Sequence, residues 1–79
     1  MSDRTSVSTD SAPAAIGPYS QGIVGAGLVH CSGQIAMDPA TGEVIGDDAA
    51  TQAEGALRNL QAVLEAAGSS LDKVLKCTV

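Results

Sequence analysis

A single amphipathic segment, bounded by Asp48 and Gly68, constrains the fold of this chain more than any other feature of its sequence. The Asp48 carboxylate can accept from the unpaired N–H groups of a first helical turn, and Gly68 suits the left-handed residue that follows a helix. We therefore predict a helix over residues 49–67. Its apolar side chains share one face, which is expected to pack on a sheet; they are Ala53, Ala56, Leu57, Leu60, Val63, Leu64 and Ala67.

Apolar stretches on either side of this segment predict the strands of that sheet. Residues 19–24 and 28–35 are predicted as two strands joined at Gly25-Ala26-Gly27, where glycine supplies the positive φ of a tight hairpin. Proline and glycine at residues 38–42 predict a turn, and residues 43–45 a short strand after it. Residues 71–79 are predicted to return to the sheet as a strand after the helical crossover.

This order of elements indicates an α+β fold in which one helix covers one face of a mixed sheet. The opposite face then needs the rest of the domain or a neighbouring subunit. Residues 1–11 are polar and are predicted to be a flexible tail, so the ordered domain comprises residues 12–79. Because no turn or cap follows Thr78 and Val79, we expect the natural protein to continue and this chain to be the first half of its fold.

Length and composition limit the classes of function. A chain of 79 residues with one tyrosine, no tryptophan and no phenylalanine builds a small core, so oligomerisation is the expected stabiliser. The formal charge of −5 and the scattering of the 4 basic residues argue against nucleic acid, whose phosphates need clustered cations. No apolar run approaches the roughly 20 residues of a membrane span. Two distant cysteines and no targeting segment point to the cytoplasm.

Ser32 and Tyr19 are the side chains that we single out for chemistry. A nucleophilic serine needs a base, and His30 lies about 6.6 Å from Ser32 along a strand, so a positioning hydroxyl is the better interpretation. Tyr19 is the only aromatic residue, and it is either a half-buried anchor or a ligand contact. His30 lacks companions for a metal site, and no metal is expected. Cys31 and Cys77 are predicted to be buried, inert thiols.

Several motifs in register resemble the RidA/YjgF family. The run APAAIGPYSQG, residues 12–22, is similar to the family's N-terminal signature, and SGQI begins 13 residues after the tyrosine. The segments DPATGE (38–43), NLQAVLEAAG (59–68) and VLKCTV (74–79) are similar to the family in order and spacing. The resemblance covers residues 12–79.

This resemblance implies a chorismate-mutase-like fold that forms a homotrimer with clefts between its subunits. It implies hydrolysis of reactive 2-imino acids and enamines (2-aminoacrylate, 2-iminopropanoate, 2-iminobutanoate) to 2-keto acids and ammonia, with no cofactor. By position, Tyr19 lines the cleft, Ser32 supplies a hydroxyl, and the backbone of Gly33 approaches the ligand. Such chemistry suits a site without a catalytic triad, because an activated imine carbon needs mainly an oriented water and a bound carboxylate.

The resemblance also implies a carboxylate-binding arginine and a water-orienting glutamate beyond Val79, and neither Arg4 nor Arg58 matches that arginine. We therefore expect no deaminase activity from residues 1–79 alone. Two other functions on the same fold stay open. One is a non-catalytic trimer that binds small ligands or acts as a chaperone. The other, least favoured by the acidic charge, is a ribonuclease or translation inhibitor.

Overall fold

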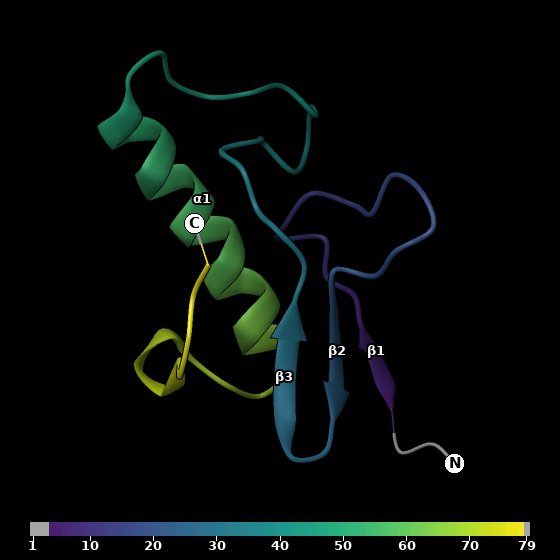
Figure 1. The fold of residues 1–79 in the computed structure, drawn as a ribbon. Coiled ribbons are helices and arrows are strands. Elements are labelled where there is room, and N and C mark those ends of the chain that lie inside the picture. The colour runs from purple at the N-terminus through teal and green to yellow at the C-terminus, as the bar shows by residue number, and fades with distance from the viewer. Residues whose placement is uncertain (1–3, 79) are drawn as a thin grey trace.

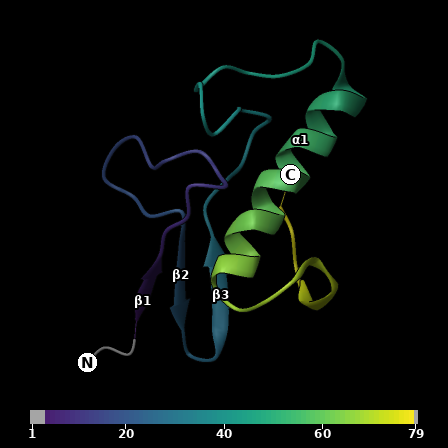
Figure 2. The same cartoon turned by 180° about the vertical axis from the view of Figure 1, so that it is seen from behind.

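The computed structural model describes residues 4–78 and shows an antiparallel sheet with one helix across one face (Figure 1). The strands are β1 (Thr5–Val7), β2 (Gly22–Gly25) and β3 (Leu28–Cys31), and they lie in the order β1-β2-β3. The helix α1 (Ala49–Ala66) packs against β3, as the reverse view also shows (Figure 2), and a 3-10 helix (Leu71–Lys73) follows it. The predicted α+β class is confirmed.

The predicted hairpin is present, with strands shorter than expected. Ala26 and Gly27 join β2 to β3, and both have positive φ, 54° and 76°. Two such residues define a type I′ turn, whose twist matches that of the strands it joins. The predicted strands extend beyond the ladder, which ends where Gly22 pairs with Cys31. Past this pair the chain leaves the sheet for loops that side chains hold in place.

The prediction of a flexible tail over residues 1–11 is wrong for most of its described part. Thr5–Val7 form β1, which pairs with β2. Val7 is 6% exposed and shares a small core with Ala12 and Val63. The polar composition gives no sign of this strand, because its order comes from pairing with the edge of β2 rather than from its own apolar content. Residues 1–3 lie outside the described range.

The helix begins and ends almost where the sequence predicts. Asp48 is the N-cap, and its carboxylate accepts from the N–H of Thr51 at 2.7 Å. At the other end Gly68 has a φ of 84°, and its N–H and that of the next residue donate back to the last turn, at 3.0 and 2.8 Å. These bonds form a Schellman motif, and the helix ends at Ala66, one residue before the predicted end.

The face of α1 that packs on the sheet is rotated from the predicted apolar face. Asn59 and Val63 are buried in the contact, whereas Leu57 is 52% exposed. One turn before Asn59 the helix carries Gly55, where an added Cβ would lie 2.7 Å from the Cβ of Ala36. Because Gly55 has no side chain, the helix can approach Ala36 most closely on this side, and this side therefore makes the packing contact.

The described part of the chain lacks two of the predicted strands. Residues 43–45 form only an isolated antiparallel bridge, between Val44 and Met37, beside the predicted turn at residues 38–42. Residues 74–78 have no regular structure, and Leu75 is 84% exposed. Their apolar pattern is that of a strand, but a strand also needs a partner edge. The described sheet is therefore antiparallel and not mixed. Val79 lies outside the described residues.

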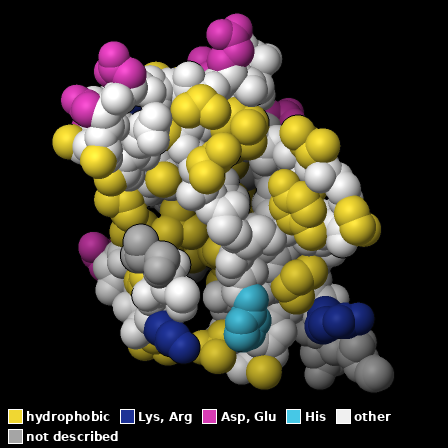
Figure 3. All heavy atoms as spheres, turned by 45° about the horizontal axis from the view of Figure 1, so that its top comes forward, with side chains coloured by type: hydrophobic (Ala, Val, Ile, Leu, Met, Phe, Trp, Pro, Cys, Tyr) yellow, Lys and Arg dark blue, Asp and Glu magenta, His cyan; other side chains and the backbone are white. Residues whose placement is uncertain are grey.

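Many large apolar side chains lie on the surface of the described residues. Figure 3 shows hydrophobic side chains over much of one face of the molecule. The most exposed are Ile16, Ile35, Val44, Leu57 and Leu75. Apolar surface of this extent is typical of regions that contact other protein. Within residues 4–78, α1 is not apolar enough over its length to cross a membrane.

Candidate functional site

The loop that carries Tyr19 lies between β1 and β2 and spans residues 13–20. Tyr19 is 52% exposed. Its N–H donates to the carbonyl of Gly17 at 2.9 Å, and its hydroxyl oxygen accepts from the N–H of Ile16 at 3.4 Å. Gly17 has a φ of 126°, a conformation that favours glycine, and the ring of Tyr19 lies beside it. The ring is therefore folded back on its own loop, with about half of its surface open to a ligand.

Ser32, the first residue after β3, is attached to the end of the same loop. Its hydroxyl donates to the carbonyl of Ser20, and its N–H donates to the carbonyl of Gln21 at 3.0 Å. The structure thus places Ser32 beside the residue that follows Tyr19, although the two lie 13 positions apart in the sequence.

This arrangement bears on the two interpretations of Ser32, as a nucleophile or as a positioning hydroxyl. The hydroxyl proton is directed to the Ser20 carbonyl, whereas His30 lies on β3 with its side chain exposed. A serine nucleophile needs its proton on a base, so the Ser32–His30 dyad is not formed. The lone pairs of the Ser32 oxygen can still accept from a ligand or a water. The geometry therefore favours a positioning hydroxyl.

Gly33 continues directly from Ser32 and is exposed. No atom of the described structure lies within 4 Å of the position where a Cβ would stand. The backbone at Gly33 is therefore open to approach by a ligand. Ser32 and Gly33 follow β3 directly, and the Ser32 hydroxyl bonds to Ser20, the residue after Tyr19, so the surface at the end of β3 adjoins the Tyr19 loop.

Two buried amides hold the segments around this surface, and the sequence analysis missed both. Gln21 is 4% exposed and Asn59 is 5% exposed. Asn59, on α1, donates from Nδ2 to the carbonyls of Ile35 and Met37, each at 2.9 Å. Its position one turn from both Gly55 and Val63 was a usable signal, because that spacing places it on the packed face. For Gln21 the sequence carries no comparable signal.

The cysteines differ from the prediction of buried thiols. Cys31 is half-buried, and burial raises the pKa of its thiol, which favours the protonated form. Cys77 is exposed, because the chain after the 3-10 helix does not join the sheet. Both are free thiols, and residues 4–78 contain no group of three side chains able to hold a metal ion.

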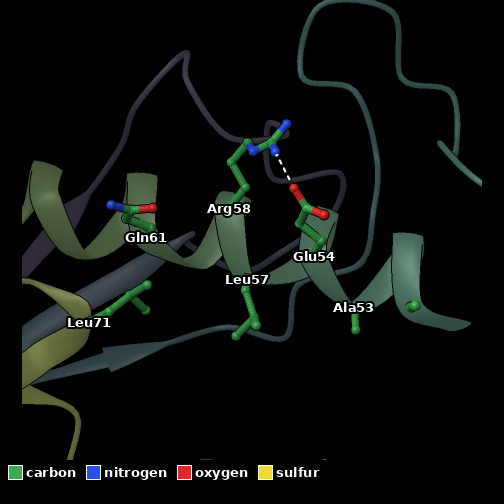
Figure 4. A pocket seen from close by; sticks show the side chains of 7 residues that line it. Ala53, Glu54, Leu57, Arg58, Gln61 and Leu71 are labelled. Atoms are coloured by element: carbon green, nitrogen blue, oxygen red, sulfur yellow. Dashed lines mark hydrogen bonds and ion pairs between the residues drawn. The ribbon is translucent and has the colours of Figure 1, made fainter.

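A separate hollow lies on the outer side of α1. It is an open groove of about 490 Å³ lined by Ala50, Ala53, Glu54, Leu57, Arg58, Gln61 and Leu71. Ala53 and Leu57 point to one side of the helix, and the ion pair of Arg58 with Glu54, at 2.8 Å, points to the other (Figure 4). This pair is exposed and contributes little to stability. None of the site residues selected from the sequence lines the groove.

Comparison with known proteins gives the family. The model of the family described as Endoribonuclease L-PSP matches residues 9–79. The chain belongs to this family, which is the RidA/YjgF/RutC family. The resemblance found in the motifs is therefore confirmed, and the matched region includes Tyr19, Ser32 and Gly33.

Relatives extend the match over nearly the whole chain. The RutC family protein y4sK of Sinorhizobium fredii is 52% identical over 92% of this chain and 58% of its own length. A bovine protein named 2-iminobutanoate/2-iminopropanoate deaminase is 45% identical over 96% of this chain and 56% of its own. The chain thus spans somewhat more than half the length of the curated relatives it matches.

Solved structures of other proteins superpose closely on this chain. The Rid-family protein YyfA of Yersinia pestis superposes with a TM-score of 0.87 at 42% identity, over 91% of this chain and 57% of that one. The protein TdcF of Escherichia coli, solved with bound serine, superposes with a TM-score of 0.76 at 46% identity, over 85% of this chain and 52% of that one. The arrangement of β1, β2, β3 and α1 is therefore that of the family.

Proposed function

We propose that the intact protein hydrolyses reactive 2-imino acids and their enamine tautomers to 2-keto acids and ammonia. The observation that carries this proposal is the 45% identity, over 96% of the chain, with a relative named 2-iminobutanoate/2-iminopropanoate deaminase. The substrate class comprises 2-aminoacrylate, 2-iminopropanoate and 2-iminobutanoate. The working form that we propose is a cytoplasmic homotrimer of chorismate-mutase-like fold, with its clefts between subunits.

The reaction requires the residues described above to orient the reactants, and it requires no nucleophilic side chain. Water adds to the imine carbon, the C–N bond breaks, and the nitrogen leaves as ammonia carrying both protons of the water. The carbon is already electrophilic, so orientation of the water and the substrate is the main contribution of the site. A surface without a nucleophile or a metal is suited to this task, and we propose no cofactor.

We assign three roles at this surface. Tyr19 offers a half-exposed ring edge and hydroxyl to the substrate. The oxygen of Ser32 has free lone pairs and accepts from the imine nitrogen or the attacking water, while its proton stays on the Ser20 carbonyl. The open backbone of Gly33 lets the substrate come close to the chain. We propose that the carboxylate of the substrate is bound by an arginine that is not among the residues described here.

The proposal is tested by ammonia release from enzymatically generated 2-aminoacrylate with the intact protein. Loss of one hydrogen bond costs about 1–1.5 kcal/mol, so Ser32→Ala and Tyr19→Phe should each lower kcat/KM about 10-fold. Ser6→Ala serves as the matched control, because Ser6 is exposed on β1 away from the loop. It should retain the unaltered rate.

Two results would contradict the proposal at different levels. Absence of ammonia release by the unaltered, folded protein would remove the deaminase function. Release that is equally fast in Ser32→Ala, Tyr19→Phe and Ser6→Ala would remove the assigned residues and leave the function in place.

A second candidate is a trimer that binds small amino-acid-like ligands without turning them over. The observation in its favour is the serine bound in the TdcF structure, which shares 46% identity with this chain. Calorimetric binding of serine together with no ammonia release would select this alternative. The family description also names an endoribonuclease. The net charge of −5 disfavours RNA, and salt-sensitive RNA cleavage by the purified protein would reverse that judgement.

A further inference from the structure

Both ends of the Tyr19 loop meet at the side chain of Gln21. The chain enters the loop after Ala12, which is 2% exposed in the core, and leaves it at Ser20. The Nε2 group of Gln21 lies 3.2 Å from the carbonyl oxygen of Ala12 and 2.7 Å from that of Pro13. Residues at the exit of the loop therefore hold its entrance, which closes the loop at its neck.

The same amide extends the sheet where its backbone pairing stops. The β1–β2 ladder ends at Val7 opposite Gly22. Beyond it, the N–H of Thr9 donates to Oε1 of Gln21 at 2.6 Å, and Nε2 of Gln21 donates to the carbonyl of Thr9 at 3.0 Å. The side-chain amide thus takes the place of a peptide group on the neighbouring strand.

The backbone of Gln21 makes a third connection, to the end of β3. Its carbonyl accepts from the N–H of Ser32 at 3.0 Å, next to the bond from the Ser32 hydroxyl to the Ser20 carbonyl. One residue therefore joins the end of β1, the neck of the Tyr19 loop and Ser32. Gln21 is only 4% exposed, so its side chain contributes almost nothing to the open surface.

We propose that Gln21 is a positioning residue, which sets the place of Tyr19 relative to Ser32 on the ligand surface. The inference rests on the proposed function only in assuming that a ligand binds at Tyr19 and Ser32. Among the described residues, the hydrogen bonds of Tyr19 go to Gly17 and Ile16 of its own loop, so its distance from Ser32 depends on how that loop is held at its neck and at Ser20. With the neck open, the loop has several conformations, and the two groups are rarely at their working separation.

Two variants of Gln21 separate this role from mere stability. Gln21→Met keeps the length of the side chain and removes every bond at the neck. Gln21→Glu keeps the acceptor for Thr9 N–H but sets an oxygen against the carbonyls of Ala12 and Pro13. A protonated glutamate can donate one hydrogen bond there, so the defect of Gln21→Glu should become smaller at lower pH, relative to the unaltered protein at the same pH. Gln61→Met, on the exposed side of α1, is the matched control.

The experiment combines hydrogen exchange of the intact protein with deaminase kinetics. In Gln21→Met, we expect the N–H groups of Thr9, Ile16 and Tyr19, which are hydrogen-bonded in the structure, to exchange at least about 10-fold faster, with α1 protected as before. Loss of orientation should lower kcat/KM about 10- to 100-fold, with a larger effect on kcat than on KM. Gln61→Met should match the unaltered protein in both measurements.

Three outcomes would overturn the inference. The first is unchanged exchange of the Thr9, Ile16 and Tyr19 N–H groups in Gln21→Met. The second is faster exchange with full activity, which would leave the proposed deaminase function intact and deny Gln21 a part in it. The third is a Gln21→Glu defect that does not diminish at low pH. If the unaltered protein releases no ammonia, the proposed function fails separately, and the exchange data still decide whether Gln21 closes the loop.

Discussion

Replacing Gly55 by alanine should destabilise the protein, although the same change in an ordinary helix is stabilising. Alanine is favoured over glycine inside a helix by about 1 kcal/mol. At Gly55, however, the new Cβ would lie 2.7 Å from the Cβ and 3.2 Å from the Cα of Ala36. Carbon atoms attract best at about 3.5–4.0 Å, so α1 and the segment after β3 must separate by up to about 1 Å.

The segment after β3 has little freedom to make this movement. Asn59 donates to the carbonyls on either side of Ala36, at 2.9 Å each, and the carbonyl of Ala36 accepts from the N–H of Ile45 at 2.6 Å. Crowding in such a site costs about 1–3 kcal/mol, and a shift that weakens one of these hydrogen bonds adds about 1 kcal/mol. After the gain in helix propensity of about 1 kcal/mol, we expect a net loss of about 1–3 kcal/mol.

Urea denaturation of the intact protein at one fixed concentration measures the effect. Ala53→Gly is the matched control, because Ala53 is exposed on the same helix and should lose only the propensity difference of about 1 kcal/mol. Adding Ala36→Gly to Gly55→Ala should recover part of the loss, with a coupling energy of about 1 kcal/mol. If Gly55→Ala is more stable than the unaltered protein by the amount that Ala53→Gly loses, the close contact does not limit the packing.

Three further changes test the turn, the helix cap and the second buried amide. Ala26→Asn should stabilise the protein by about 0.5–1 kcal/mol in thermal unfolding, because asparagine tolerates the positive φ at the first position of a type I′ turn better than alanine; an unchanged or lower midpoint would contradict this. Hydrogen bonds from the Thr51 side chain and N–H lower the pKa of Asp48 below its ordinary value of 3.8, so the cap stabilises the helix above that value and is lost as the pH falls through the lowered pKa. Asp48→Asn keeps the acceptor without titrating, and any advantage of Asp48 over it should shrink between about pH 5 and about pH 2, whereas a constant difference would show that the charge of Asp48 adds nothing to the cap. Asn59→Asp places an oxygen against two carbonyls in a site that is 5% exposed, and should cost about 3 kcal/mol at pH 7 in urea denaturation, an effect that a loss below about 1 kcal/mol would refute.

The features that the sequence predicted well depend on neighbouring residues. The start of α1 at Asp48, its stop at Gly68 and the turn at Ala26 and Gly27 each follow from local φ preferences and nearby hydrogen bonds. Tyr19 and Ser32 were singled out from the sequence, and the structure bonds Ser32 to Ser20, the residue after Tyr19. Their function stays a proposal.

The features that were missed depend on residues far apart in the sequence. β1 exists because β2 offers an edge to Thr5–Val7, which composition cannot reveal. The packed face of α1 is decided at Gly55 and Ala36, where close approach matters more than hydrophobicity. The expected strand after the 3-10 helix has a suitable pattern but no partner among the described residues. Each error arises where tertiary contact outweighs local propensity.

The closed neck of the Tyr19 loop separates ligand contact, which the loop would make, from folding of the sheet. If Gln21 closes the neck as proposed, its bonds to Ala12 and Pro13 hold the two ends of the loop together, and we expect the pairing of β1, β2 and β3 to depend little on the residues between Pro13 and Ser20. We therefore expect most residues inside the loop, apart from Gly17 with its positive φ, to be exchangeable without displacing the sheet. For protein engineering, residues 14–19 are then the segment in which ligand preference would be varied while the sheet is kept.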